Sequence, residues 1–389
     1  MPSFSEILTN LKRENRLRVI PAFNCENFID LSSNDYLSLG ARCDEFREEF
    51  LDRFADADFS SSASRLLSTK QKYHNYLENF LELLYGRPSL LFNSGYHANV
   101  GCIGALSLPS TLFVCDKLIH ASIVDGLKIG GGEFKRFPHN DLVKLRRILE
   151  SASGNYDRIV VVVESIYSMD GDEAPLQALV NLKKEFPDIL LYVDEAHAFG
   201  VRGPHGLGIA EELGLINNVD IIIGTLGKAA ASSGAFVVCN VELKSLLINT
   251  ARPFIFSTAL PPANIAWSIL MIEKIVSMNY ERDRLAELSK KFSDRLQLIS
   301  GKPTGSSSQI VPFLTGSAES ALSIASGLRD AGFLALPIRR PTVPPGGERI
   351  RFSLSADLDF DSLLPLFATL KSSTEIIHSP FKGLGGLPK

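Results

Sequence analysis

The sequence predicts an α/β fold: a doubly wound, mostly parallel sheet in a large domain, followed by a smaller C-terminal α+β domain. Two observations support this prediction. From about residue 70, short apolar stretches alternate with helical patterns, which is typical of a parallel sheet with helices on its faces. Several of these stretches are continuous β-branched runs, such as IVVVV at Ile159–Val163, and such runs are typical of strands buried on both faces.

Seven strands are expected in the large domain: Ser89–Phe92, Thr111–Cys115, Glu133–Phe137, Arg158–Val163, Ile189–Val193, Val219–Gly224 and Ala235–Val238. Helices are expected between them. One covers residues 139–152, where Asn140 or Asp141 caps the start, and another covers 176–186.

The regions outside this sheet are expected to be simpler. Residues 5–18 predict a short amphipathic helix whose basic face carries Lys12, Arg13, Arg16 and Arg18, and extended structure and a turn follow at 23–40. A long helix is expected from about 263 to 298. Strand, helix, strand and helix are then expected within 306–316, 320–333, 347–356 and 360–373, before a Gly- and Pro-rich tail at 378–389 that is expected to be loose. The expected division is 1–45, 46–260 and 261–389.

Composition excludes several classes of protein. The 389 residues contain 40 Lys and Arg against 44 Asp and Glu, a net charge of −4, which argues against a nucleic-acid binder. The five cysteines are odd in number and form no C-x-x-C pair, so reduced thiols are expected at Cys25, Cys43, Cys102, Cys115 and Cys239. The start has no secretory signal, and no apolar run approaches the ~20 residues of a membrane helix. A cytoplasmic protein is expected.

Polar residues follow five of the expected strands. These are Asn93–Tyr96, Asp116 with His120, Glu164–Ser168, Asp194–His197, and Thr225–Lys228. In an open parallel sheet, ligands bind beyond the carboxyl ends of the strands. The sequence therefore predicts one polar site at one edge of the sheet.

Lys228 is the candidate nucleophile of that site. It follows an apolar strand and a glycine, and desolvation at such a position would lower the pKa of the amine and free it to react. The alternative is a surface lysine at a helix start. The helix dipole disfavours a cation there, which favours the functional interpretation.

Asp194 ends a buried strand, so it needs a partner: a metal, a protonated ring nitrogen or an arginine. Asp194 and His197 have no third ligand nearby, and no metal is expected. The alternative for His120 is an ordinary histidine at a helix start. Gly95 and Tyr96 open a helical stretch whose free N–H groups suit a phosphate, and Thr225 can add a hydroxyl.

The segment VDEAH at 193–197 also matches the DEAH box of nucleic-acid-dependent ATPases. That class needs an upstream P-loop, G-x-x-x-x-G-K-[ST]. The sequence has only Gly227-Lys228, which lies downstream, with Ile222 in place of the first glycine and Ala229 in place of Ser or Thr. We reject this interpretation.

Eight segments together resemble the α-oxoamine synthases, which are fold-type I enzymes dependent on pyridoxal 5′-phosphate. They are SSNDYLSLG, FNSGYHAN, DKLIHAS, ESIYSMDGDEAPL, VDEAHAFG, GTLGKAAASSGA, ARPFIFSTALPP and PTVPPGGERIRFSLSA, in the family's order. The resemblance covers roughly residues 5–360. It implies a fold-type I transferase that acts as a homodimer.

The resemblance also assigns roles to residues. Lys228 would hold the cofactor covalently, Asp194 would face its ring nitrogen, His197 would bond its phenolic oxygen, and His120 would stack on the ring. The remaining cofactor contacts would be Ser168, Gly95, Tyr96 and Thr225, with Ser257 and Thr258 reaching the phosphate of the second subunit. The substrate side would comprise Arg351, which takes the amino-acid carboxylate, with Asn34, Thr342 and Arg18; Arg13 and Arg16 compete with Arg18 for its place.

Within the family, the segments are most similar to the member that condenses L-alanine with a pimeloyl thioester in biotin synthesis. The alternatives are 2-amino-3-oxobutyrate ligase, 5-aminolevulinate synthase and serine palmitoyltransferase, which share the cofactor motifs and differ in pocket shape. The thioester donor is coenzyme A or an acyl carrier protein. A partner subunit without catalysis is disfavoured because Lys228 is present.

Two departures from the family pattern are visible. Phe59–Ser64 replaces a glycine-rich stretch, and Ala231 stands where glycine is common. Serine and alanine tolerate positive φ less well than glycine. The acyl channel or its mobility is therefore expected to differ.

Overall fold

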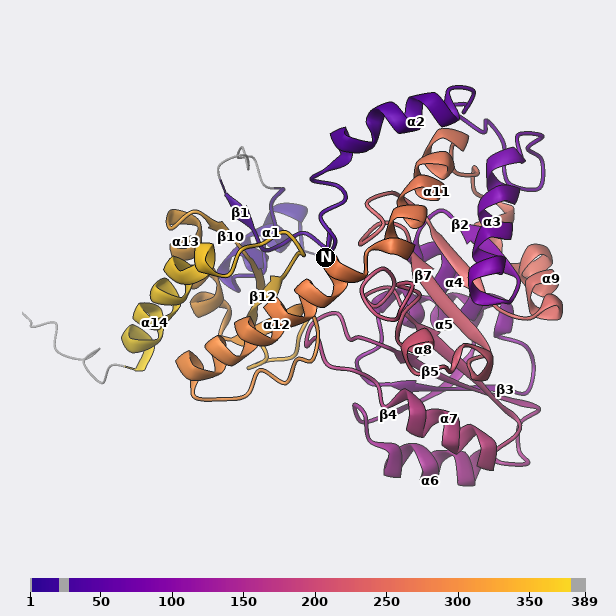
Figure 1. Cartoon of the computed structure of the whole chain (residues 1–389). Coiled ribbons are helices and arrows are strands. Elements are labelled where there is room, and N and C mark those ends of the chain that lie inside the picture. The colour runs from indigo at the N-terminus through magenta and orange to yellow at the C-terminus, as the bar shows by residue number, and fades with distance from the viewer. Residues whose placement is uncertain (1, 21–27, 379–389) are drawn as a thin grey trace, which may run out of the picture. The chain divides into compact units, whose positions relative to one another are not determined.

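The computed structural model describes residues 2–20 and 28–378, and these form two compact units (Figure 1). The large unit comprises Asp35–Ser168 and Glu173–Asp283. The small unit comprises the described residues up to Asn34, the short stretch Met169–Asp172, and those from Arg284 onward. The unit boundaries thus fall after 34 and 283, whereas the sequence suggested 45 and 260.

A seven-stranded sheet forms the centre of the large unit, in the order β2-β8-β7-β6-β5-β3-β4 (Figure 1). Its strands are β2 (Ser89–Phe92), β3 (Thr111–Asp116), β4 (Glu133–Phe137), β5 (Arg158–Glu164), β6 (Ile189–Asp194), β7 (Ile221–Thr225) and β8 (Ala235–Val238). β8 pairs antiparallel with both β2 and β7, and all other pairs are parallel. The predicted mostly parallel α/β sheet is confirmed.

The strand bounds agree with the sequence pattern to within two residues at each end. The β-branched runs are buried, because helices cover them: in β5 all residues after Arg158 are buried, and β7 is buried throughout. A core beneath α4 and α5 includes Val160, Ile223 and Tyr192. The prediction from continuous apolar runs succeeds because such runs can be buried on both faces.

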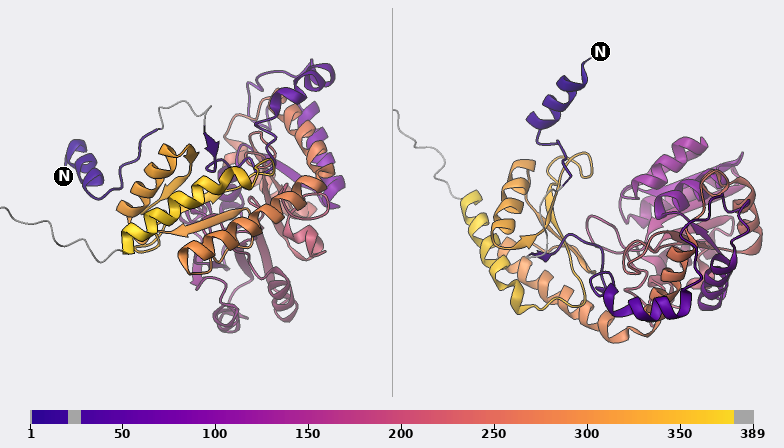
Figure 2. Two further views of the ribbon diagram at one scale, coloured as in Figure 1. Left: turned by 60° about the vertical axis from the view of Figure 1, so that its left-hand side comes forward. Right: turned by 90° about the horizontal axis from the view of Figure 1, so that it is seen from above.

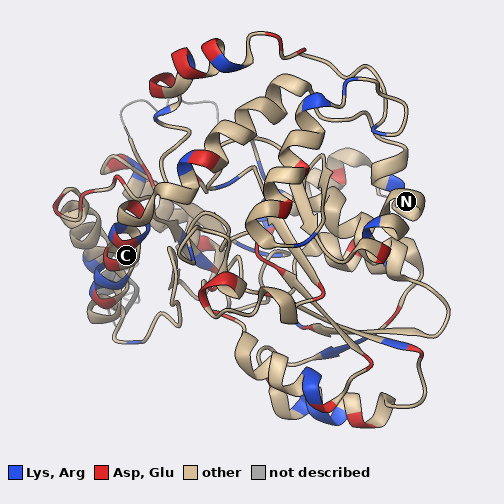
Figure 3. Ribbon diagram, turned by 45° about the vertical axis from the view of Figure 1, so that its right-hand side comes forward, with Lys and Arg blue, Asp and Glu red and all other residues tan. Residues whose placement is uncertain are grey.

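The helices of the large unit follow the strands in alternation. They are η1 (Cys43–Phe46), α2 (Arg47–Phe54), α3 (Lys72–Tyr85), α4 (Gly95–Leu106), α5 (Ala121–Gly130), α6 (Leu142–Ala152), α7 (Leu176–Glu185), α8 (Ile209–Glu212), η2 (Ile216–Asn218), α9 (Val241–Thr250), α10 (Arg252–Ile255) and α11 (Pro262–Ser277). Asp141 caps α6 by accepting a hydrogen bond from the Lys144 N–H. Figure 3 shows acidic and basic residues interspersed along these elements.

The single long helix expected at 263–298 is wrong. Two helices occupy the segment, α11 and α12 (Asn279–Ser300), and they are separated at Met278. The carbonyl of Ile275 accepts from the Met278 N–H at 3.0 Å and from the guanidinium of Arg282 at 2.6 Å, so the arginine supplies a second donor where the helix breaks. α11 packs against α2 and α3, and it therefore belongs to the large unit.

The described part of the small unit contains two short sheets with helices packed on them. β9 (Ile310–Leu314), β12 (Arg349–Ser353) and β11 (Leu336–Ile338) form an antiparallel sheet, while β1 (Ile29–Asp30) pairs parallel with β10 (Phe333–Leu334). α13 (Ala318–Asp330) packs on these strands and on α14 (Leu364–His378), which follows η3 (Asp361–Leu363), as two further views show (Figure 2). The four expected elements are present as β9, α13, β12 and α14, but the sequence pattern missed β10 and β11, which lie between α13 and β12.

The N-terminal helix is shorter than expected. α1 (Phe4–Arg13) begins with a capping box at Ser3 and ends before Asn15, whose φ is +54°. Arg16 and Arg18 therefore lie beyond the helix, and the expected basic helix face of four residues is wrong.

Both departures from the glycine pattern coincide with unusual backbone. Ser62 has a φ of +51° and Ala231 a φ of +44°, the left-handed region that favours glycine. Four cysteines, Cys43, Cys102, Cys115 and Cys239, are free thiols. The expectations for Cys25 and for the tail at 379–389 lie outside the described residues.

Candidate active site

Five strand ends bring the predicted polar residues to one edge of the large sheet. β2, β7, β6, β5 and β3 all run in the same direction, because β8 alone is reversed among the strands of this sheet. Their carboxyl ends therefore share an edge. The polar site predicted from strand ends lies where open parallel sheets bind ligands.

Lys228 lies in the turn between β7 and β8, not at the start of a helix. The turn is closed by backbone bonds from Leu226 N–H to Gly234 and from Ser232 N–H to Leu226. The expectation of a helix start is wrong, so the dipole argument does not apply to this lysine. Its position directly after a buried strand still makes the amine half-buried.

His197 joins the amine of Lys228 to a buried tyrosine. Lys228 Nζ lies 2.8 Å from His197 Nε2, and the hydroxyl of Tyr36 lies 2.6 Å from His197 Nδ1. Both His197 and Tyr36 are buried. The imidazole therefore has both ring nitrogens engaged and is held next to the amine. Sequence reasoning identified Lys228 and His197 and missed Tyr36.

Asp194 ends β6 with both carboxylate oxygens engaged by N–H donors. Oδ1 accepts from the Ala196 N–H at 3.0 Å, and Oδ2 accepts from Asn99 Nδ2 at 2.8 Å. Asp194 is 5% exposed. The described residues contain no cluster of His, Cys, Asp and Glu that could hold a metal ion.

His120 is the N-cap residue of α5. Its Nδ1 accepts from the Ser122 N–H at 3.3 Å and lies 2.6 Å from Ser122 Oγ. The residue is exposed on one side, yet the surrounding elements desolvate the ring enough to lower its pKa; Asp194 opposes this shift and Lys228 adds to it. The neutral imidazole is thus favoured.

Glu164 is a buried carboxyl that sequence reasoning noted at a strand end without giving it a role. It is the register partner of Asp194 between β5 and β6 and is 2% exposed. Burial, and next the charge of Asp194, raise the pKa of Glu164 well above its usual range. Lys228 opposes the rise, as do hydrogen bonds from the backbone of Ser168 and His120. Glu164 therefore lies among the predicted site residues.

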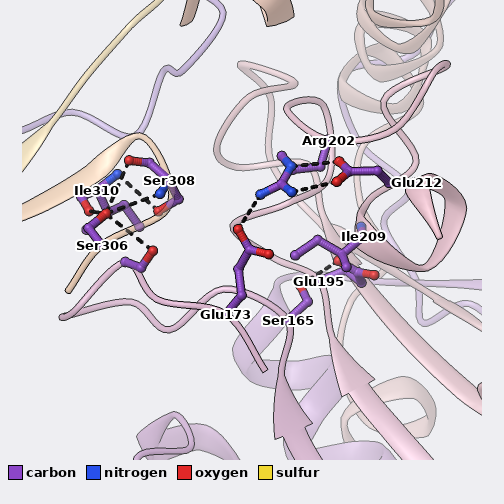
Figure 4. Close-up of polar contacts among 10 residues, drawn as sticks. Ser165, Glu173, Glu195, Arg202, Ile209, Glu212, Ser306, Ser308 and Ile310 are labelled. Atoms are coloured by element: carbon purple, nitrogen blue, oxygen red, sulfur yellow. Dashed lines mark hydrogen bonds and ion pairs between the residues drawn. The ribbon is translucent and has the colours of Figure 1, made fainter. Parts of the chain in front are cut away.

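Glu195 is the second buried carboxyl that the sequence did not assign. Its carboxylate accepts from Ser165 Oγ at 2.5 Å and from the Ile209 N–H at 3.1 Å (Figure 4). It also accepts from the Ala210 N–H at 2.8 Å. Burial raises the pKa of Glu195 to about 7, although these three hydrogen bonds oppose the rise. Glu195 ties the segment after Asp194 to β5 and to the start of α8.

The expected phosphate-binding residues lie at the start of α4. Ser94 caps this helix by accepting from the His97 N–H, and Gly95 and Tyr96 are its first two residues. A Cβ on Gly95 would lie 3.8 Å from Thr225 Oγ1, so the helix N-terminus and that hydroxyl are close together. Such a pair of N–H groups and a hydroxyl suits an anion.

Ser257 and Thr258 lie close to Asn93 of the same chain. Asn93 Nδ2 donates to Ser257 Oγ at 3.0 Å and to the Thr258 carbonyl at 2.7 Å. Asn93 directly precedes the cap of α4.

The four expected substrate residues form two pairs in the small unit. Arg351 Nη2 donates to Asn34 Oδ1 at 3.1 Å, and Arg18 Nη2 donates to Thr342 Oγ1 at 2.8 Å. Among the competing arginines, Arg16 instead pairs with Glu14.

A second arginine lies near the Arg18 pair. Arg339 donates to the Asn15 carbonyl at 2.6 Å. Burial lowers the pKa of Arg339, and the charge of Arg18 lowers it further.

The large-unit residues fit pyridoxal phosphate by their donor set. The half-buried amine of Lys228, the anchored carboxylate of Asp194 and the imidazole of His197 match the aldehyde, the ring nitrogen and the phenolic oxygen of that group. The start of α4 with Thr225 matches its phosphate.

Comparisons with known proteins identify the family of the chain. The family described as aminotransferase class I and II matches residues 26–366. The 8-amino-7-oxononanoate synthase of Haemophilus ducreyi is 43% identical over 388 residues, covering 95% of this chain and all of that protein. A protein of Pasteurella multocida that bears the same name provisionally is 42% identical over 384 residues, covering 96% of this chain and 99% of that one.

A solved structure supports the fold and the cofactor. The serine palmitoyltransferase of S. paucimobilis, in a structure that holds pyridoxal phosphate, is 29% identical with a TM-score of 0.83, covering 90% of this chain and 88% of that one. None of the described helices is long and apolar enough to cross a bilayer. The chain belongs to the aminotransferase class I and II family, and within it to the pyridoxal-phosphate-dependent α-oxoamine synthases.

Proposed function

We propose that the protein condenses L-alanine with a pimeloyl thioester, with loss of carbon dioxide, to give 8-amino-7-oxononanoate for biotin synthesis. The observation that carries this proposal is the Lys228–His197 contact of 2.8 Å, which lies at the sheet edge that also presents Asp194. The 43% identity to a named 8-amino-7-oxononanoate synthase supports the substrate pair.

In this proposal each residue has a defined task. Bound pyridoxal phosphate supplies an electron sink for the negative charge that develops at the amino-acid Cα. Lys228 would hold the cofactor and, as a free amine, would remove the Cα proton as general base. Asp194 would keep a proton on the ring nitrogen, and His197 would orient Lys228 and bond the phenolic oxygen.

The other site residues position the two substrates and the cofactor. His120 would stack on the cofactor ring, Ser168 would contact the cofactor, and Gly95, Tyr96 and Thr225 would bind its phosphate. Arg351, held by Asn34, takes the amino-acid carboxylate in a bidentate pair. Arg18 and Thr342 would line the substrate side together with Asn34.

The proposal includes a homodimer in which Ser257 and Thr258 reach the phosphate of the second subunit. The donor is coenzyme A or an acyl carrier protein, and the free thiols support a cytoplasmic location. The alternative function is condensation of serine with a long acyl thioester, which the likeness to serine palmitoyltransferase favours.

One assay separates these functions. The cofactor-loaded protein is incubated with alanine, glycine or serine and with pimeloyl, acetyl or palmitoyl thioesters, and thiol release is followed. Alanine with a pimeloyl thioester should give the fastest release. Faster turnover of serine with palmitoyl thioester, or of glycine with acetyl thioester, would reassign the substrates.

A second measurement tests the cofactor independently of turnover. Borohydride should fix pyridoxal phosphate to the wild-type chain and not to Lys228→Ala, whereas both proteins bind it reversibly through the phosphate contacts. Failure of the wild-type protein to take up pyridoxal phosphate would refute the proposal.

A further inference from the structure

A buried amide on α4 lies between two residues of the proposed site. Asn99 is 2% exposed, and it donates through Nδ2 to Asp194 Oδ2 at 2.8 Å and to Ser122 Oγ at 2.9 Å. Its carbonyl oxygen accepts from the hydroxyl of Tyr192 at 2.5 Å. Asparagine is a poor helix former compared with alanine, so its place inside α4 calls for a compensating role.

The orientation of this amide follows from its neighbours. An ionised carboxylate only accepts hydrogen bonds, so the NH₂ group of Asn99, and not its oxygen, faces Asp194. The oxygen then faces Tyr192, which donates. Tyr192 and Asp194 are two residues apart in β6, so their side chains lie on the same face of the sheet. Asn99 bridges the two.

The second N–H of the same NH₂ group determines the direction of the next hydrogen bond. It donates to Ser122 Oγ, so that oxygen is an acceptor and its own proton is free to point elsewhere. The acceptor within reach is His120 Nδ1 at 2.6 Å. Ser122 is fully buried.

His120 Nδ1 is consequently an acceptor. The Ser122 backbone N–H also points at it, at 3.3 Å, as the cap of α5. A protonated Nδ1 cannot accept from either group. The ring proton is therefore on Nε2.

We propose that Asn99 is a positioning residue that, through Ser122, fixes His120 as the neutral Nε2–H tautomer while it anchors Asp194. The amide of Asn99 would thus orient both Asp194, which would face the ring nitrogen of the cofactor, and His120, which would stack on the cofactor ring. The inference rests on the proposed function for what His120 and Asp194 contact, but the tautomer itself is a property of the protein alone.

The test uses the full chain labelled with ring-¹⁵N histidine. Long-range ¹H–¹⁵N spectra, in which His120→Gln identifies the His120 signals, read the protonation of each ring nitrogen directly. In the wild-type protein at pH 7.5, Nε2 should be protonated and Nδ1 should be an unprotonated acceptor. Ser122→Ala removes the O–H donor with little change in volume but keeps the backbone N–H that points at Nδ1, so the fraction of the Nε2–H tautomer should fall without being lost.

Asn99→Ala should produce the same shift, because the Ser122 hydroxyl is no longer held as an acceptor. The control is Asn249→Ala on α9, whose amide lies exposed and donates to a backbone carbonyl in its own helix; it should leave the His120 signals unchanged. If Asn99→Ala does not fold, Ser122→Ala alone decides the test.

Two results would overturn the inference: a wild-type His120 protonated at Nδ1, or identical His120 signals in the wild-type protein and Ser122→Ala. Thiol release from alanine and pimeloyl thioester is measured on the same samples. Release with the wrong tautomer refutes this inference and keeps the proposed function, whereas the right tautomer without release does the opposite.

Discussion

Replacing Glu195 with glutamine should change how stability depends on pH. Glu195 is fully buried, and its pKa is raised from 4.5 to about 7. The folded protein therefore holds this proton between pH 4.5 and 7 while the unfolded chain releases it. By linkage, the free energy of unfolding falls as pH rises through that window and levels off above pH 7.

The magnitude follows from the two pKa values. Each pKa unit corresponds to 1.36 kcal/mol, so this carboxyl lowers the free energy of unfolding by about 2.5 kcal/mol between pH 5 and pH 8. Glutamine cannot ionise and loses this dependence. Glutamine also places an NH₂ group against one of the three O–H and N–H donors that face Glu195, and this lowers the free energy of unfolding by about 1–3 kcal/mol at low pH. The deficit of Glu195→Gln relative to wild type should therefore shrink by about 2.5 kcal/mol from pH 5 to pH 8.

Urea unfolding of the apo protein, followed by tryptophan fluorescence, measures this difference. Trp267 is the single tryptophan of the chain and lies in α11 of the same unit as Glu195. Glu242→Gln, at an exposed position on α9, is the matched control and should show no shrinking deficit. A deficit for Glu195→Gln that stays constant from pH 5 to pH 8 would refute the reasoning.

Three further outcomes are expected. Tyr36→Phe removes the partner of His197 Nδ1 and should weaken pyridoxal phosphate binding by about 1–2 kcal/mol, measured by absorbance titration; unchanged affinity would contradict the contact. The lysine of Arg351→Lys cannot form a planar fork. This variant should raise KM for alanine by a factor equivalent to roughly 2–5 kcal/mol of binding free energy, while KM for the acyl thioester stays nearly constant. An equal rise in both KM values would exclude the assigned role. Ala231→Gly relieves the strain of the positive φ, so the free energy of unfolding in urea should stay the same or rise by up to about 1 kcal/mol. The control Ala178→Gly, inside α7, should lower it by about 1 kcal/mol. Equal losses in the two variants would show that Ala231 is unstrained.

The sheet and its polar edge were predictable from local patterns. Runs such as Ile159–Val163 carry their burial in their composition, and the residue that follows each run marks the strand end. Lys228, Asp194 and His197 were found this way. The local pattern was insufficient at the break between α11 and α12, where the guanidinium of Arg282 donates to the carbonyl of Ile275.

The residues that the sequence missed have roles set by neighbours distant in the chain. Asn99 lies in an ordinary helical stretch, and its hydrogen bonds reach residues of β6 and α5. Tyr36 acts on His197 from more than 150 residues away. Glu164 was visible at a strand end, but only its pairing with Asp194 shows that two carboxyls adjoin.

The reversed strand β8 has a consequence for the order in which the chain is made. β2 lies at one edge of the large sheet, and its partner there is β8. Ser89 therefore cannot pair until Val238 has been synthesised. During synthesis the apolar strand SLLF therefore leaves the ribosome long before the strand that covers it. Unpaired edges of this kind invite association with other chains. Premature termination before β8 should yield a nascent protein that depends on chaperones to stay out of aggregates.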